Sequence, residues 1–237
     1  QSLHVKESIE YHPSPLVKAT LRPYQIEGVQ WLLEHYNNGL GACLADDMGL
    51  GKTLQTLSTL VAVQEKLEVE KAENIQLDLF GNEIPVAKEY LKALIVLPSS
   101  LVFNWYNEAR KFTPHFRRIQ YVGQDRKLLS KKLAKYDLIF TSYAVVARDF
   151  SILEKYQFRY LILDESQYIK NKNSKIFKAI NQLQTTHKIS LSGTPIENSL
   201  DDLWSQMQFI NPNILGSYAF FAEHYKFPIE KKQDENS

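Results

Sequence analysis

The feature that most constrains the fold is a series of short, continuous apolar runs separated by longer polar stretches. Each run is rich in Leu, Ile and Val, and small or polar residues follow it. Continuous apolar strands are typical of a parallel sheet that is covered on both faces. We predict five such strands and a weaker sixth: GACLA (41–45), ALIVLP (93–98), DLIFTS (137–142), YLILDE (160–165), KISLSGT (188–194) and, more weakly, RRIQYVG (117–123).

Helical patterns occupy the stretches between these runs. Residues 23–35 place apolar side chains at helical spacing, and they begin with a proline suited to a first helical position. A second helix is expected over 52–65, and a third runs through 105–111 with Ser99 or Ser100 as its cap. Strands that alternate with helices predict an α/β fold, a doubly wound and mostly parallel sheet with helices on both faces. In such folds ligands bind at the carboxyl ends of the strands.

Composition narrows the classes of function. The chain has 237 residues, 44% hydrophobic and 23% charged, which suits one large α/β domain or two small ones. A net charge of +1 gives no global basic field, so any nucleic-acid surface must be local. Cys43 is the only cysteine, which excludes a disulfide framework within the chain and suits a reducing compartment. No run approaches ~18 apolar residues, so we expect no membrane span.

Three segments fall outside the alternating pattern. Residues 64–92 are long and charged, and we expect a helix end followed by a polar excursion. Residues 1–20 are interpreted as an N-terminal extension. The polar tail 230–237 is interpreted as the start of a linker.

The stretch CLADDMGLGKTLQ (43–55) ends like a phosphate-binding loop. Such a loop needs a strand before it, a backbone that can approach an anion, and a helix N-terminus after it. The predicted strand and helix flank the loop, and Gly49 and Gly51 supply the permissive backbone. Asp46 stands where the usual pattern has its first glycine, and Gly49 compensates for it.

Two side chains after this loop carry its chemistry. Lys52 would reach the β- and γ-phosphates of a nucleotide, and Thr53 would place its hydroxyl on Mg²⁺. The alternative is a plain strand–turn–helix in which the Gly-Lys-Thr sequence is a coincidence.

An acidic pair supplies what a phosphate loop requires for hydrolysis. The apolar run 160–165 ends in Asp164 and Glu165. On a strand adjacent to the loop strand, Asp164 would hold Mg²⁺, and Glu165 would act as general base toward the attacking water. The alternative is an ordinary strand that happens to end in acidic residues.

Taken in order, these motifs resemble those of the first RecA-like lobe of the Swi/Snf-type ATPases, within the superfamily-two helicases. The resemblance covers 21–229 and rests on LRPYQIEGVQWL, LADDMGLGKTLQ, LIVLPSSLVFNWYNEARKF, LIFTSYAVV, LILDESQYIKN and LSGTPIENSLDDLWSQMQFINP. The family places an acidic residue where other phosphate loops have their first glycine, as Asp46 does here.

The resemblance implies ATP and Mg²⁺ as ligands and assigns roles to particular residues. Nucleotide contacts fall on Gln25 (to adenine), Asp46, Met48, Gly49, Leu50, Gly51, Lys52, Thr53 and Leu54. Catalysis falls on Lys52, Asp164, Glu165 and Gln167, metal binding on Thr53 and Asp164, and coupling on Ser192, Gly193 and Thr194. Contacts to a DNA backbone fall on Ser99, Ser100, Asn104, Thr141 and Ser142, for which helix capping is the alternative role.

The chain also departs from the family. Gln167 occupies a position where eukaryotic members usually carry histidine, which favours a bacterial member. Glutamine can still hydrogen-bond a phosphate or the third motif, but it does not titrate. The family's second lobe, with its arginine fingers, has no counterpart in the sequence. Because such fingers contribute ~10³–10⁵ in rate, we expect nucleotide binding with poor turnover.

The function expected on this basis is that of the ATP-binding lobe of a double-stranded DNA translocase. The implied partners are duplex DNA, a second RecA-like lobe of the full-length chain and a DNA-bound protein target. The implied location is cytoplasmic, at the nucleoid of a bacterium, or the nucleus of a eukaryote. The alternative is a regulatory module that binds ATP or DNA without hydrolysis, although the intact Lys52, Asp164 and Glu165 argue against it. A small-molecule kinase lacks any obvious lid or acceptor base.

Overall fold

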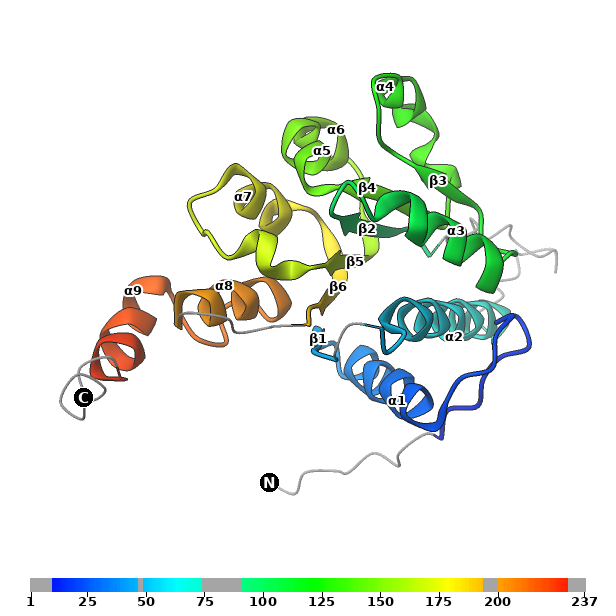
Figure 1. Cartoon of the computed structure of the whole chain (residues 1–237), viewed down its shortest axis with the longest axis horizontal. Helices are drawn as coiled ribbons and strands as arrows, with labels where there is room; N and C mark the ends of the chain where they lie inside the picture. The colour runs from blue at the N-terminus through cyan, green and yellow to red at the C-terminus, as the bar shows by residue number, and fades with distance from the viewer. Residues whose placement is uncertain (1–9, 47–48, 74–90, 194–199, 230–237) are drawn as a thin grey trace, which may run out of the picture.

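The protein is built around one parallel sheet, shown in the computed structural model of Figure 1, which describes residues 10–46, 49–73, 91–193 and 200–229. Within these ranges the sheet has six strands in the order β1-β6-β5-β2-β4-β3, and every neighbouring pair is parallel. The strands are β1 (Ala42–Leu44), β2 (Ala93–Leu97), β3 (Arg118–Gln120), β4 (Leu138–Ser142), β5 (Phe158–Asp164) and β6 (Thr185–Leu191). All six predicted strands, including the weak one, are confirmed.

The strand order corrects one expectation about the site. We expected the strand that ends in Asp164 to lie next to the loop strand, but β6 lies between β5 and β1. In the parallel register, Leu191 of β6 is opposite Leu44 on one side and Asp164 on the other. Apolar runs that are buried on both faces do not encode which run pairs with which, so this order was not available from the pattern.

Helices cover both faces of the sheet (Figure 1). Two separate clusters of buried side chains fill the space between the sheet and its helices. One face carries α1 (Pro23–Asn37), α2 (Lys52–Glu73) and α3 (Val102–Phe112); the other carries α5 (Tyr143–Arg148), α6 (Phe150–Leu153), α7 (Lys175–Gln182) and α8 (Leu200–Ile210). Shorter elements are α4 (Arg126–Leu129), the 3-10 helices η1 (Ser130–Lys135) and η2 (Ser166–Ile169), α9 (Tyr218–Phe221) and the π-helical turn η3 (Ala222–Lys226).

The central strand β2 shows why the apolar runs are continuous. Ala93, Ile95 and Leu97 belong to one core cluster, and Leu94 and Val96 to the other. All of them are fully buried. A strand with packed helices on both faces has no solvated side, so it carries no polar alternation.

The described part of the predicted N-terminal extension, residues 10–20, packs against the lobe. Tyr11 and Val17 are buried in the first core cluster. The Ser14 hydroxyl donates to Glu65 Oε1 of α2 at 2.6 Å, and the Lys18 amide donates to the Phe112 carbonyl of α3 at 2.7 Å. Residues 10–21 therefore cover the outer side of α2 and α3.

The charged stretch after the phosphate loop begins as helix. α2 continues to Glu73, beyond the end predicted at 65, because the added residues are mostly good helix formers. The rest of the predicted excursion, 74–90, and the tail 230–237 lie outside the described residues. Among the described helices, none is long and apolar enough to cross a membrane.

Candidate active site

The loop between β1 and α2 has the backbone of an anion-binding turn. Gly49 and Gly51 adopt φ angles of 86° and 78°, in the left-handed region that favours glycine. A Cβ on Gly51 would also collide with Nε2 of Gln25. The chain therefore turns sharply into α2, whose first N–H groups have no partners within the helix and can meet an anion. Met48 lies outside the described residues.

Asp46 belongs to the scaffold of this loop. The Asp46 carboxylate accepts a hydrogen bond from Gln55 Nε2 of α2 at 3.1 Å, and its carbonyl accepts one from Lys52 Nζ at 2.6 Å. The carboxylate thus ties the end of β1 to the first turn of α2, which is a role that a glycine could not fill.

Gln25 of α1 supports the loop from outside. Its Nε2 donates to the Leu50 carbonyl at 3.2 Å, while its Oε1 accepts from the Arg22 amide at 2.9 Å. Thr53 and Leu54 begin α2 as half-buried residues, and Leu54 packs against the first core cluster. Each predicted nucleotide residue among the described ones therefore lies in the loop or in contact with it.

The acidic pair lies at the carboxyl end of β5. The Asp164 side chain is buried, and both of its oxygens accept hydrogen bonds: Oδ2 from Trp105 Nε1 at 2.8 Å and Oδ1 from the Glu165 amide at 3.0 Å. Burial raises the pKa of Asp164, whereas the Trp105 hydrogen bond and the positive charge of Lys52 act to lower it. The influence of Lys52 links the loop electrostatically to this carboxylate across β6.

Glu165 holds an unusual backbone conformation. Its φ and ψ are 50° and 56°, a left-handed geometry that costs a non-glycine residue of order 1–3 kcal/mol. Such strain is concentrated at functional sites, where the geometry of one side chain outweighs its cost to stability. Here it ends β5 abruptly and starts η2 at the next residue.

A short chain of side-chain contacts connects Glu165 to the end of β6. Gln167 Nε2 donates to Glu165 Oε2 at 2.8 Å, and the Ser192 hydroxyl donates to Gln167 Oε1 at 3.5 Å. Ser192 directly follows β6, beside Asp164, as the sequence predicted. Gly193 closes this described segment, and Thr194 lies outside the described residues.

The predicted DNA contacts divide into two groups. Ser99, Ser100 and Asn104 are exposed in the turn before α3 and in its first turn. Neither serine caps α3, because the N-cap is Leu101 and no side chain caps that helix end. The expected alternative role in helix capping is therefore wrong for both serines.

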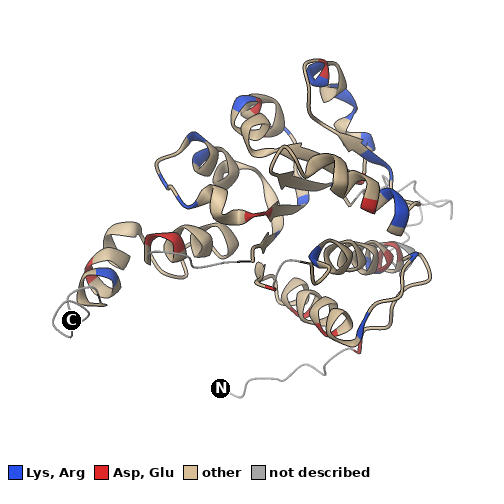
Figure 2. Cartoon of the chain, in the orientation of Figure 1, with Lys and Arg blue, Asp and Glu red and all other residues tan. Residues whose placement is uncertain are grey.

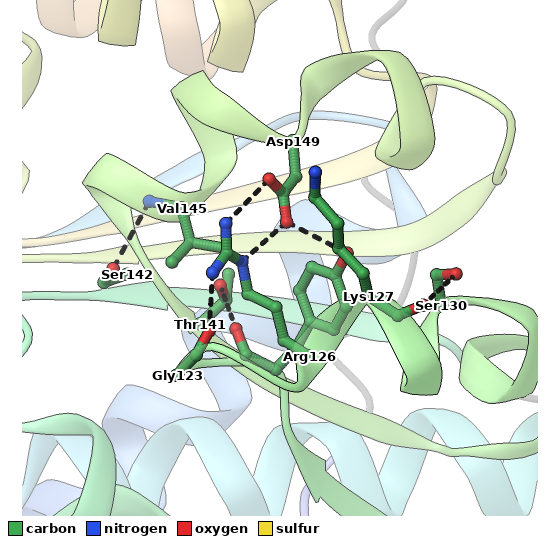
Figure 3. Close-up of polar contacts among 9 residues, drawn as sticks. Gly123, Arg126, Lys127, Ser130, Thr141, Ser142, Val145 and Asp149 are labelled. Atoms are coloured by element: carbon green, nitrogen blue, oxygen red, sulfur yellow. Dashed lines mark hydrogen bonds and ion pairs between the residues drawn. The ribbon is translucent and has the colours of Figure 1, made fainter.

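Thr141 and Ser142 require a correction. The Thr141 side chain is fully buried, and its hydroxyl donates to the Tyr121 carbonyl at 2.8 Å. Ser142 is also buried and caps α5 by accepting from the Val145 amide at 3.4 Å. Figure 3 shows both residues inside this network of internal contacts. Their hydroxyls serve the fold, so we withdraw them as backbone contacts to DNA.

A buried ion pair between Arg126 and Asp149 lies beside these residues and anchors the segment that follows β3 (Figure 3). Arg126 Nε and Nη2 donate to the two oxygens of Asp149 at 2.6 and 2.9 Å, and the Tyr121 hydroxyl donates to Asp149 Oδ2 at 3.1 Å. Burial alone would raise the pKa of Asp149, but hydrogen bonds from Arg126 and Tyr121 outweigh it and lower that pKa. Burial and the neighbouring Asp149 charge raise the pKa of Tyr121 to about 12.

Local positive charge lies on the α4–η1 segment that this ion pair anchors. Figure 2 shows Lys and Arg gathered there and also around α7. Residues 126–135 (RKLLSKKLAK) contain no acidic residue. The exposed cations of this basic segment are Lys127, Lys131, Lys132 and Lys135.

Sequence reasoning missed two residues of the site. Trp105, within the helix predicted over 105–111, is buried, and its indole N–H reaches Asp164. The Tyr143 hydroxyl donates to the Asp164 carbonyl at 2.6 Å, and the Tyr143 ring stacks on Tyr168 with centroids 4.8 Å apart. The only available signal was position, because Tyr143 directly follows β4 and Trp105 lies in the helix that follows β2, and both strands end at the ligand-binding edge.

The donor set fits Mg²⁺ bound together with a nucleotide. In the described part of the chain, no group of three or more His, Cys, Asp or Glu side chains could hold a metal by itself. Mg²⁺ is usually bound by one or two carboxylates with substrate phosphates and waters completing its shell. Asp164 and the Thr53 hydroxyl supply that partial set, and the left-handed glycines leave room for phosphates.

The parallel sheet and the loop with its acidic partner define a RecA-like P-loop nucleotide-binding lobe. Residues 24–237 match the family model for the SNF2-related domain. The chain belongs to this SNF2 family of ATPases.

The most informative similarities come from bacteria, yeast and archaea. The chain is 38% identical over 229 residues to the putative ATP-dependent helicase/translocase YwqA of Bacillus subtilis, covering 95% of this chain and 23% of that protein. It is 37% identical to the TATA-binding protein-associated factor MOT1 of Saccharomyces cerevisiae, covering 90% of this chain and 11% of MOT1. The solved SWI2/SNF2 ATPase core of Sulfolobus solfataricus in complex with double-stranded DNA is similar at a TM-score of 0.78 and 42% identity, over 94% of this chain and 42% of that one.

The chain thus spans less than half the length of these relatives. The similarity covers the part of each relative that corresponds to this lobe. The relatives are longer chains, and their activities are those of the whole proteins.

Proposed function

We propose that the chain is the first RecA-like lobe of an ATP-dependent double-stranded DNA translocase. It binds Mg-ATP in the loop between β1 and α2 and contacts the DNA backbone, and hydrolysis requires a second lobe. The observation that carries the proposal is that the loop with Lys52 follows β1 while Asp164 and the strained Glu165 end β5, so that all three lie at the carboxyl edge of one parallel sheet. A family member that only bound nucleotide would gain nothing from the cost of holding Glu165 in a left-handed conformation.

The chain's own residues divide the work as follows. Lys52 would exchange its hydrogen bond to the Asp46 carbonyl for the β- and γ-phosphate oxygens. Glu165, oriented by Gln167, would accept a proton from the attacking water. Mg²⁺, when bound, would neutralise phosphate charge next to Asp164 and Thr53.

Coupling between hydrolysis and the rest of the motor has a physical route. Ser192, Gln167 and Glu165 form one chain of contacts from the end of β6 to the proposed base. A change at the phosphate that pulled on Gln167 would therefore also pull on Ser192 and the segment after it.

DNA binding is supported by placement and by charge. Ser99, Ser100 and Asn104 are exposed polar groups that follow β2 at the carboxyl edge of the sheet, and the basic segment 126–135 follows β3, the edge strand beyond β4. Contacts of this kind address phosphates and would be independent of sequence and sensitive to salt. A DNA-bound protein remains a proposed target, and the nucleoid or the nucleus a proposed location.

The test is single-turnover hydrolysis of labelled Mg-ATP, with and without duplex DNA. The 237-residue chain is measured alone and joined to a second RecA-like lobe of the family. We expect hydrolysis only from the two-lobed protein, with acceleration by duplex DNA. Lys52→Ala should abolish nucleotide binding, and Glu165→Gln should preserve binding but eliminate hydrolysis.

Two results would contradict the proposal. Fast hydrolysis by the single lobe would point to a self-contained NTPase. The absence of hydrolysis from the two-lobed protein, with DNA bound, would favour a non-catalytic module.

A further inference from the structure

Asp164 is held by side chains from two other elements of the lobe. Trp105 of α3 donates its indole N–H to Asp164 Oδ2 at 2.8 Å. Tyr143, the first residue of α5, donates its hydroxyl to the Asp164 carbonyl at 2.6 Å. All three residues are buried, so these hydrogen bonds do not compete with bulk water.

The Trp105 contact fixes the plane of the carboxylate. A tryptophan can only donate, and a hydrogen bond to an ionised carboxylate is stronger than one between neutral groups. The second carboxylate oxygen accepts from the Glu165 amide at 3.0 Å. With one donor fixed on each oxygen, the remaining lone pairs have a defined direction.

Trp105 is buried, but it lies next in sequence to the exposed face of α3. Its neighbour Asn104 is exposed, and the exposed Ser99 and Ser100 lie in the turn that leads into α3. One short rigid element therefore carries the proposed DNA contacts on its surface and a hydrogen bond to the proposed metal ligand inside. Tyr143 of α5 adds a second internal hydrogen bond, to the backbone carbonyl of the same aspartate.

We propose that Trp105 is a positioning residue that orients the Asp164 carboxylate for Mg²⁺ and transmits movements of α3 on DNA binding to that carboxylate. Tyr143 fixes the backbone at the same residue. The inference rests on the proposed function, because it assigns a regulatory path to the same site.

The first experiment measures how nucleotide binding depends on Mg²⁺. A fluorescent ATP analogue is titrated at a series of Mg²⁺ concentrations and in EDTA, for the wild type and for Trp105→Phe. The variant keeps an aromatic ring but loses the N–H donor. Changes to groups that orient metal ligands typically cost about 10–100-fold in metal affinity. We therefore expect the half-maximal Mg²⁺ concentration to rise about 10-fold or more, with metal-free binding unchanged.

Matched controls separate this effect from loss of packing. Trp204→Phe makes the same change in α8, where the indole donates to the Gly216 carbonyl at 3.2 Å, away from Asp164. Tyr106→Phe changes the residue next to Trp105 on α3, where the Tyr106 ring packs edge-on against Phe140 in the adjacent core. Both controls should match the wild type in Mg²⁺ dependence. Circular dichroism establishes that each variant is folded.

The second experiment reads the coupling without any turnover. The indole N–H resonance of Trp105, assigned by its loss in Trp105→Phe, is followed by NMR. Duplex DNA should shift it in the wild type, and the shift should shrink at least several-fold in Asn104→Ala.

The possible outcomes are distinct. If the wild type does not bind Mg-nucleotide, the proposed function itself fails. If it binds, but folded Trp105→Phe has the wild-type Mg²⁺ dependence, the positioning role is overturned. If DNA binds without moving the Trp105 resonance, the transmission role is overturned.

Discussion

Replacing Arg126 by methionine should be strongly destabilising, because the ion pair that it forms with Asp149 is buried. The substitution retains an apolar stem but leaves Asp149, whose side chain is 1% exposed, without its two guanidinium hydrogen bonds and with the hydrogen bond from the Tyr121 hydroxyl. Removing one member of a buried ion pair costs ~3–5 kcal/mol, because the remaining charge is left without compensation. For a chain of this size each kcal/mol lowers Tm by about 2–4 °C, so we expect a fall of roughly 6–20 °C.

The assay is urea and thermal unfolding followed by circular dichroism, with an ion pair whose arginine is exposed as the control. Arg117 pairs with Asp137 at 3.2 Å, but the Arg117 side chain is 44% exposed. Arg117→Met should therefore cost no more than ~1 kcal/mol. If Arg126→Met is no more destabilising than Arg117→Met, burial does not decide the strength of these pairs and the reasoning is refuted.

A double variant tests the cause of the loss. Arg126→Met combined with Asp149→Leu removes both charges, and apolar replacements of buried pairs are often neutral or stabilising. We expect it to be more stable than Arg126→Met alone. The contribution of the wild-type pair should also depend on pH. Because the pKa of Asp149 is lowered in the folded state, that contribution is complete above the unfolded value of about 3.9 and is lost as the pH falls through the lower folded value.

Three further predictions address other parts of the lobe. Burial lowers the pKa of His187 to about 4, below its unfolded value of about 6.5. Between these two pH values the unfolded chain binds more protons, so the free energy of unfolding falls on acidification. His187→Phe should therefore reduce the difference in unfolding free energy between urea melts at pH 7 and pH 4.5 by ~1–2 kcal/mol, a value that allows for the partial solvent exposure of the ring. Gly28→Ala places a Cβ against Gln55 Oε1, and it should cost ~1–3 kcal/mol in urea melts and weaken binding of a fluorescent nucleotide. Ser174 caps α7 by accepting from the Phe177 amide at 3.0 Å, so Ser174→Ala should lower the free energy of unfolding by ~1 kcal/mol and leave nucleotide binding unchanged.

The strands could be predicted from the sequence because their burial is extreme. β2 was predicted over 93–98 and runs from Ala93 to Leu97, with every residue buried. The loop was equally accessible, because its glycines and lysine are contiguous and their geometry is local. The features that the sequence predicted best are therefore those determined by residues close together in the chain.

What could not be predicted depends on contacts between distant parts of the chain. Trp105 and Asp164 are 59 positions apart, and nothing in either segment specifies that they meet. The hydrogen-bond partner of the buried Thr141 hydroxyl is the Tyr121 carbonyl, which follows a different strand, β3. The same holds for the order of the strands, which is determined by competition among similar apolar runs.

The position of β6 between β1 and β5 determines how far apart the glycine-rich loop and the acidic pair lie. Neighbouring strands lie ~4.8 Å apart, so the ends of β1 and β5 are separated by ~10 Å. β6 therefore separates the strand before the glycine-rich loop from the strand that ends in Asp164, and Ser192, which directly follows β6, lies between the ends of these two strands.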